Sequence, residues 1–130
     1  MKATRFLILG GLALTLVLLC ACGSNPERAQ GRMVRIAELE IDPAQLENYK
    51  AELRTEIEAS IRLEPGVLAL YAVSLTNNPT SIRILETYAD TDAYKAHIES
   101  LHFKKYKTNT EAMVKSLKLV ETDPVLLGAK

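Results

Sequence analysis

VLALYAVSLTNNPTSIRILETYA, residues 67–89, is the stretch of sequence that decides the fold. Two apolar and β-branched runs, 67–75 and 81–89, flank a polar segment at 76–80 that holds two Asn and a Pro. Such runs with a short turn-forming connection indicate a β-hairpin. Alternation predicts one apolar side of strand 67–75 made by Val67, Ala69, Tyr71, Val73 and Leu75, and another made by Leu68, Leu70 and Ala72. Apolar residues on both sides predict that both faces of the sheet are covered.

The segment before this hairpin predicts a strand and a helix. Residues 33–41 are β-branched and nearly alternating, which is typical of a strand. Asp42 is a good helix N-cap, and Pro43 suits the first helical turn. The helix is expected to end at 64–66, since Gly66 can adopt a positive φ. Its apolar stripe has helical spacing and comprises Leu46, Tyr49, Leu53, Ile57 and Ile61. The charged residues between these positions, Glu56 among them, are expected to form a solvated face.

The segment after the hairpin predicts two helical pieces and a last strand. Asp90 or Thr91 is expected to cap a helix that runs to about Ser100. Residues 116–122 predict the final strand, followed by Asp123 and Pro124 as its stop. The second helical piece has an apolar stripe formed by Phe103, Tyr106, Thr110, Met113 and Leu117.

The order β-α-β-β-α-β predicts an α+β fold of the ferredoxin-like type, with a four-stranded antiparallel sheet and helices on one face. One helical layer cannot cover two apolar faces of a sheet. We therefore expect a homodimer, in which two sheets pack face to face as a dimeric α/β barrel. A domain of about 100 residues would gain materially from this burial.

The first 21 residues predict a lipoprotein signal peptide. Lys2 and Arg5 precede an uncharged apolar run at 6–19, which is shorter than the roughly 20 residues of a membrane span. Residues 19–22, Leu-Cys-Ala-Cys, resemble a bacterial lipobox, which implies cleavage before Cys22 and its acylation. Gly23 in place of Asp favours the periplasmic face of the outer membrane in a Gram-negative host. An ordinary signal peptide that is cut elsewhere is the alternative.

The composition of residues 22–130 predicts three segments and argues against nucleic-acid binding and thiol chemistry. Residues 22–31 predict a flexible tether, 32–123 the folded domain and 124–130 a C-terminal tail. Without Lys2 and Arg5, the 16 basic residues become 14 against 16 acidic ones, a formal charge of −2. This balance argues against a nucleic-acid partner. Both cysteines precede residue 23, so the domain has no thiol chemistry.

Residues 96–106, AHIESLHFKKY, hold both histidines of the chain. Imidazole titrates near neutral pH, so His97 and His102 are the natural candidates for proton transfer. Capping or packing at a helix junction is the alternative. A spacing of five residues does not place two imidazoles on one helical face, so no metal site is expected.

Three pieces of the domain resemble the antibiotic biosynthesis monooxygenase (ABM) family, which includes quinol monooxygenases. They are the E-P-G turn at 64–66, the E-x-aromatic-x-D pattern at 86–90, and the A-H-x-x-S-x-H-F junction at 96–103. Two positions depart from the family pattern. Leu101 stands where the family usually has Pro, and Tyr88 stands where it usually has Trp.

The resemblance implies a dimer that oxidises quinols or other small electron-rich aromatics with molecular oxygen, without metal or flavin. Two alternatives stay open: a non-catalytic dimeric module that binds an apolar small molecule or a stress signal, and a protein that binds or degrades haem. His102 is the first candidate for the base, with His97 and Tyr88 as further catalytic candidates. The expected substrate contacts are Tyr71, Glu86, Phe103, Leu70 and Met113, for which core packing or cross-strand pairing is the alternative role.

Overall fold

A computed structural model describes residues 31–128 of the chain. The predicted signal peptide, the lipidation site at Cys22 and all of the predicted tether except Gly31 lie outside the described residues, as do residues 129–130. Among the helices of residues 31–128, none combines the length and hydropathy that a membrane-spanning segment needs.

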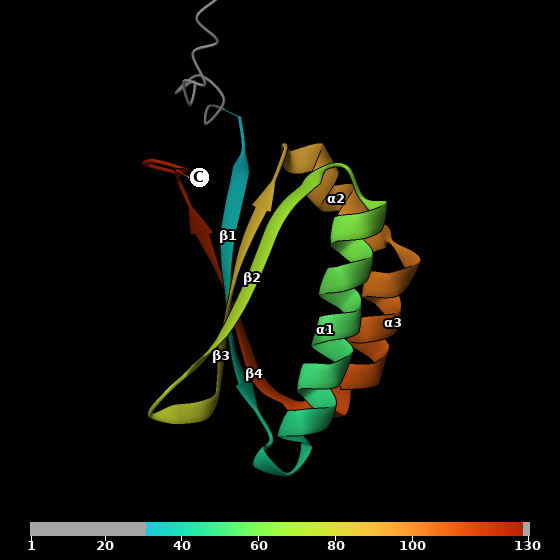
Figure 1. Ribbon diagram of the computed structural model, residues 1–130, viewed down its shortest axis with the longest axis vertical. Coiled ribbons are helices and arrows are strands. Elements are labelled where there is room, and N and C mark those ends of the chain that lie inside the picture. The colour runs from blue at the N-terminus through green and yellow to red at the C-terminus, as the bar shows by residue number, and fades with distance from the viewer. Residues whose placement is uncertain (1–30, 129–130) are drawn as a thin grey trace, which may run out of the picture.

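The described chain is a βαββαβ fold with one four-stranded sheet in the order β2-β3-β1-β4 (Figure 1). All three strand pairings are antiparallel. The predicted α+β ferredoxin-like fold is therefore confirmed. The elements are β1 (Met33–Ile41), α1 (Leu46–Leu63), β2 (Val67–Leu75), β3 (Asn78–Tyr88), α2 (Thr91–Glu99), α3 (Leu101–Thr110) and β4 (Val114–Thr122).

The helices lie on one face of the sheet, and no helix of residues 31–128 lies on the other face (Figure 1). The core lies between the two layers, where α1 and α3 pack on the central strands. Its largest fully buried side chains include Tyr49 and Tyr88. The main core cluster comprises Ala37, Leu39, Ile41, Tyr49, Leu53, Ile82, Ile84 and Tyr106.

Side-chain caps determine where the helices begin. Asp42 caps a short 3₁₀ turn (Pro43–Gln45) by accepting a hydrogen bond from the Ala44 amide at 2.9 Å, so α1 begins at Leu46. Asp90 caps α2 and accepts from the Ala93 amide at 2.8 Å. Ser100 is extended, with φ −65° and ψ 150°, and its Oγ accepts from the Phe103 amide at 3.3 Å. This break at Ser100 separates α2 from α3 and turns His97 and His102 toward the same region.

The hairpin and the last strand differ from the sequence prediction. The β2–β3 turn is Thr76–Asn77 rather than 76–80, because Leu75 already pairs with Asn78. A register shift between Val67 and Ala69 turns Val67 into the core beside Leu70 and Tyr88, so its predicted face was wrong. A bulge of this kind breaks the simple alternation from which that face was inferred.

The last strand, β4, also begins earlier than the sequence predicts. The apolar stripe assigned to the second helical piece is not helical throughout. Met113 ends a 3₁₀ turn (Glu111–Met113), and Leu117 pairs with Leu39 within β4, which begins at Val114. Helical and strand spacing coincide over these few apolar positions, so the pattern alone did not separate them.

Gly66 is required by packing rather than by a left-handed backbone. Gly31 is the one described glycine with a positive φ, so the expectation for Gly66 was wrong. A Cβ at Gly66 would lie 2.5 Å from Cβ of Ala93 and 3.4 Å from its Cα. The absence of a side chain therefore lets α2, which carries His97, approach the start of β2.

We expect Gly66→Ala to destabilise the fold by about 1–3 kcal/mol, because the new methyl group meets Ala93, which has no flexible side chain to move away. The free energy of unfolding in urea measures this. Gly128→Ala is the matched control, since a Cβ there meets nothing within 4 Å. Equal stability of the two variants would contradict the close approach.

Candidate functional site

A cavity of about 280 Å³ lies between the sheet and the helices. Its wall is mostly apolar, with a small set of polar groups, which is the usual character of a small-molecule site. The polar or ionisable residues that line it are Arg35, Glu56, Glu86, Tyr88, Tyr94, His97, Tyr106 and Lys107. The apolar residues are Ala37, Leu39, Leu53, Ile57, Leu70, Ile84, Ile98, Phe103, Leu117 and Leu119.

The carboxylate of Glu64 joins both histidines of the chain beside this cavity. Its Oε1 lies 3.0 Å from Nδ1 of His97 and 2.5 Å from Nε2 of His102. Ser100 Oγ lies 3.1 Å from the same Nε2 of His102. The E-P-G turn and the helix junction, which are over thirty residues apart in sequence, therefore form one hydrogen-bonded group.

The ionisation of Glu64 determines which ring nitrogens carry protons. Burial raises the pKa of Glu64, but the hydrogen bonds from His97 and His102 outweigh it and hold that pKa below its ordinary value. An ionised carboxylate can only accept hydrogen bonds. Nδ1 of His97 and Nε2 of His102 must therefore both donate to Glu64. In a neutral ring this leaves Nε2 of His97 with a free lone pair.

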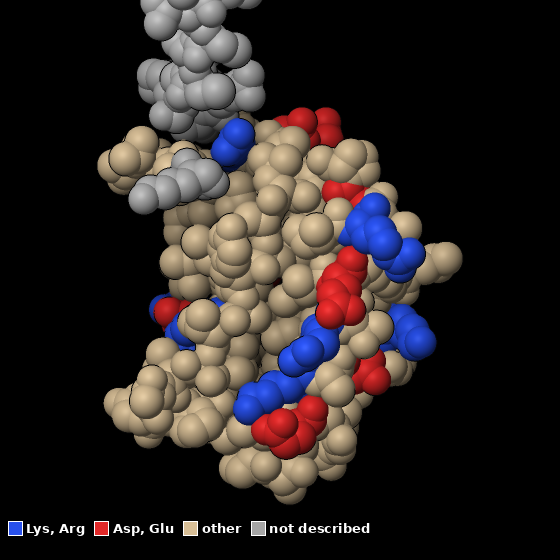
Figure 2. All heavy atoms as spheres, viewed as in Figure 1, with Lys and Arg blue, Asp and Glu red and all other residues tan. Residues whose placement is uncertain are grey.

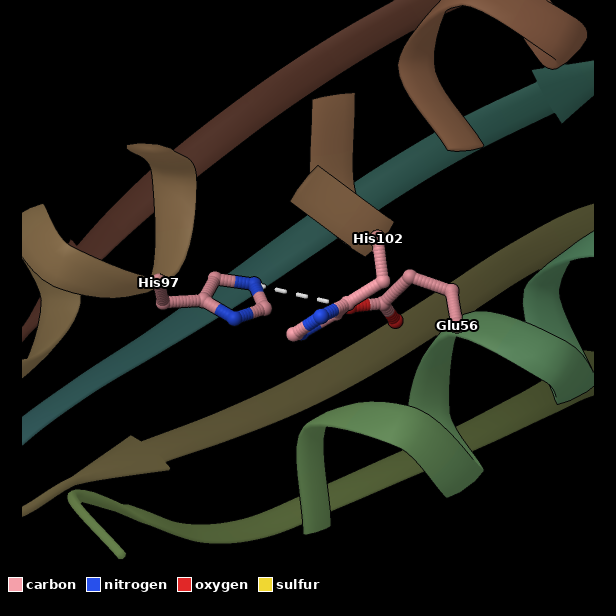
Figure 3. A group of neighbouring side chains, drawn as sticks. All are labelled: Glu56, His97 and His102. Atoms are coloured by element: carbon pink, nitrogen blue, oxygen red, sulfur yellow. Dashed lines mark ion pairs between the residues drawn. The ribbon is translucent and has the colours of Figure 1, made fainter. Parts of the chain in front are cut away.

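Nε2 of His97 faces Glu56, whose Oε1 lies 3.7 Å away, beyond hydrogen-bond distance. Ser60 Oγ donates to Glu56 Oε1 at 2.7 Å. Burial raises the pKa of Glu56, while the Ser60 hydrogen bond and the two histidines partly offset it. Figure 3 shows the side chains of Glu56, His97 and His102 converging from three separate helices. The result is a buried acid–base group at one end of the cavity.

Aromatic rings fix the orientation of His97. The ring centroid of Phe103 lies 4.7 Å from that of His97, and the centroid of Tyr88 lies 5.4 Å from it. Tyr88 donates its hydroxyl hydrogen to Glu86 Oε2 at 3.1 Å. Burial raises the pKa of both partners, so Tyr88 remains a donor. Only 3% of His97 is exposed, so the imidazole has little freedom to turn.

Arg35 supplies a buried cation to the same cavity. It lies opposite Glu86 in the β1–β3 pairing. Its Nη1 donates to the Tyr94 hydroxyl and its Nη2 to Glu121 Oε1, both at 2.6 Å. Its guanidinium carbon also lies 4.5 Å from the centroid of the Tyr94 ring. Nε of Arg35 is the one buried side-chain nitrogen or oxygen of residues 31–128 without a hydrogen-bond partner. This cation can therefore stabilise an anion in the cavity.

The cavity contains most of the site residues expected from the sequence. His97, Tyr88, Glu86, Phe103 and Leu70 line it. The remaining three do not. His102 hydrogen-bonds to Glu64 but does not line the cavity, and Met113 packs against the main core cluster. Tyr71 follows Leu70 in β2 and so points to the opposite face of the sheet, where it is 65% exposed.

Three residues with roles in this arrangement were missed by the sequence reasoning. Glu64 was recognised as part of a turn, and Glu56 was taken as part of the solvated face of α1. Arg35 lies within the predicted first strand and was given no role. A faint signal existed for Glu56. It lies three residues after Leu53 and four before Ser60, on the side of the helix that faces the core.

The chain matches the family described as antibiotic biosynthesis monooxygenase over residues 32–109. A crystal structure from Bacteroides thetaiotaomicron that is named for this family is 52% identical, with a TM-score of 0.76, and the match covers 78% of this chain and 97% of that one. Structures from Nitrosomonas europaea and Caulobacter crescentus, at 24% and 22% identity and TM-scores of 0.70 and 0.71, share the fold. They cover 74% and 77% of this chain and 93% and 95% of their own. No curated protein matches the chain.

We expect Glu64→Gln to lower the free energy of unfolding near neutral pH by about 2 kcal/mol, because both imidazoles lose a charged acceptor. The pKa of Glu64 is lower in the folded than in the unfolded state, so its ionisation stabilises the fold above its ordinary value of 4.5. This contribution disappears as the pH falls through the folded-state pKa. Urea unfolding of both proteins from neutral to acidic pH should therefore show a difference that shrinks below pH 4.5. A difference that is independent of pH would contradict this assignment, and the exposed Glu47→Gln serves as the control.

Proposed function

This chain belongs to the antibiotic biosynthesis monooxygenase family, and from that membership we propose a cofactor-independent monooxygenase that acts on a quinol or another small electron-rich aromatic. The observation that carries the proposal is the contact of Glu64 with Nδ1 of His97, which leaves Nε2 to act as the base in an apolar cavity with a buried arginine. These are the two groups that direct oxidation of a phenol needs: a base to form the anion and a cation to stabilise it.

The size and lining of the cavity support a small ring as the substrate. Its volume of about 280 Å³ is at the low end of the range for ligand sites. Leu70, Ile84 and Phe103 offer apolar walls for an aromatic ring, and such walls exclude water from a reactive anion. A porphyrin macrocycle contains four pyrrole rings and needs far more room, so the dimensions favour a quinol over haem.

We assign the role of base to His97 rather than to His102, which was the first candidate from the sequence. His97 lines the cavity and His102 does not. Glu64 accepts from Nδ1 of His97 and so keeps the lone pair of Nε2 toward the cavity, and it stabilises the imidazolium that forms when a proton is taken. His102 is a positioning residue in this scheme, because it acts through Glu64.

The proposed reaction balances without an external reductant. With an anthrone-like substrate, His97 removes one proton of the ring CH₂ group, and the anion formed beside Arg35 gives electrons directly to molecular oxygen. In an anthrone-like substrate, a ring CH₂ becomes a carbonyl group. One oxygen atom enters that carbonyl, and the other leaves as water with the two hydrogens of the CH₂ group, one of which His97 returns. The substrate supplies all the electrons that the oxygen molecule accepts.

We further propose that the protein acts as a homodimer, anchored in the cell envelope through lipid on Cys22. Support for the dimer comes from the sheet face without helices, where Tyr71, Val73 and Leu85 are exposed apolar residues. In the view of Figure 2, the charged side chains gather mostly over the helices. The open sheet face also carries charges, but there Glu38 pairs with Arg83 and Lys118. An envelope location would bring the cavity near membrane quinols.

We expect His97→Gln to lower oxygen uptake with reduced quinones or anthrone-like phenols by about 100-fold or more, since a general base contributes about 10²–10⁴ to the rate. His102→Gln should cost less than His97→Gln, because its amide can still donate to Glu64. An oxygen electrode and quantification of the carbonyl product measure both. Loss of turnover in His102→Gln with full turnover in His97→Gln would contradict the assignment of the base. An inactive wild-type protein across the panel would contradict the oxygenase itself.

For the dimer, light scattering of a Cys22→Ser chain should give twice the mass of one chain. Tyr71→Glu with Val73→Glu places charges on the open sheet face and should give monomers, because burying unpaired charges is costly. Leu101→Glu is the matched control, since Leu101 is 87% exposed on the helical side. A wild-type monomer would contradict the proposed face-to-face assembly.

A further inference from the structure

We infer that Glu56, His97 and His102 form a binding site for a divalent transition metal ion of the zinc type. One possible ligand atom from each residue lies within 4.8 Å of those of the other two. Two imidazoles and one carboxylate are a donor set that suits zinc and similar ions. The three residues come from α1, α2 and α3, so the site exists only in the folded chain (Figure 3).

The separations within the group are close to those that a metal requires. Two nitrogen or oxygen ligands about 2.1 Å from a tetrahedral zinc ion lie about 3.4 Å from each other. Nε2 of His97 and Oε1 of Glu56 are 3.7 Å apart. This pair therefore needs a movement of only a few tenths of an ångström. The ligand atom of His102 lies within 4.8 Å of the other two, so it must close by up to about 1.4 Å and give up its hydrogen bond to Glu64 for the metal.

Residues around the three candidate ligands already make the kind of hydrogen bond that orients ligand side chains in metal sites. Glu64 accepts from Nδ1 of His97, which is the carboxylate–histidine arrangement that fixes the ring with Nε2 free for a metal. Ser60 donates to Glu56 and holds its carboxylate in place. Glu56 and Glu64 together can balance the two positive charges of the ion in a buried setting, where unpaired charge is costly.

A metal ion bound at this site would be accessible from the cavity. Glu56 and His97 line the cavity, so a metal between them would have a coordination position directed toward it. In a site with three protein ligands, water or a small molecule takes the fourth position. Because the metal would use the lone pair of His97 Nε2, we infer that it inhibits proton removal. This regulatory part, unlike the binding itself, rests on the proposed function.

The test is a calorimetric titration of the untagged full chain with Zn²⁺. It should be done in a Cys20→Ser, Cys22→Ser background, because thiolates at these positions would also bind zinc. We expect one ion per chain. The visible absorption of bound Co²⁺, which reports ligand geometry, provides a second readout that does not depend on turnover. Absence of binding to either ion at millimolar concentration would overturn the inference.

Variants of the three ligands test where the ion binds. We expect Zn²⁺ binding to weaken by at least about 10-fold in each of His97→Gln, His102→Gln and Glu56→Gln. Even residues that only hydrogen-bond to a metal ligand change the affinity by about 10- to 100-fold. Glu99→Gln is the control, because Glu99 lies exposed at the end of α2 and pairs with Lys104. Thermal melting identifies any variant that fails to fold. The Zn²⁺ affinities of the two folded ligand variants with the smallest change in melting temperature then decide whether the ion binds at this site. Equal affinity in these variants and in Glu99→Gln would overturn the site.

Turnover separates the two proposals. If Zn²⁺ binds and oxygen uptake falls in proportion to occupancy, both the site and its inhibitory role are supported. If Zn²⁺ binds and uptake is unchanged, the inhibitory role is overturned while the binding site stands. If the protein shows no uptake without metal, the oxygenase proposal fails, and calorimetry and the Co²⁺ spectrum still decide the site on their own.

Discussion

The carboxylate of Glu64 is the group on which the organisation of this site depends. It lies at the end of α1 and accepts hydrogen bonds from imidazoles on α2 and α3, so it ties three helices together at the end of the cavity. Because an ionised carboxylate can only accept, it also dictates which ring nitrogen of each histidine carries a proton. One side chain therefore links the packing of the helices to the acid–base state of the site.

Two backbone features make this arrangement possible. The extended conformation of Ser100 ends α2 and starts α3, which turns His97 and His102 toward Glu64 from different helices. Gly66 lets the start of β2 approach Ala93 closely, and this places α2 against the sheet. The apolar cavity below then keeps water away from groups whose charges are costly to bury. The same cluster can hold a proton or, as we infer, a metal ion, but not both on Nε2 of His97.

Much of the fold could be predicted from the sequence, because local signals agree with one another. The cap at Asp90 or Thr91, the apolar stripe of α1 and the alternation in residues 33–41 each specify an element directly. Ile61, the last residue of the predicted stripe, is 50% exposed. The bulge after Val67 could not be predicted, since one extra residue changes the face of Val67 relative to the rest of β2 without a local marker. The site was predicted in part. The histidines were found by their residue type, but Glu56 and Arg35 gain their roles only from long-range packing, which periodicity does not report.

The central claim is that Glu64 holds His97 with its proton on Nδ1 and its lone pair on Nε2. Long-range ¹H–¹⁵N NMR correlations of the imidazole rings test this claim most directly, at about pH 8, where an ordinary imidazole is neutral. Our account predicts a protonated Nδ1 and an unprotonated Nε2 for His97, and the opposite protonation for His102. Glu64→Gln should loosen this preference. A His97 ring with its proton on Nε2 would contradict the account, because that nitrogen could then neither take a proton from substrate nor bind a metal.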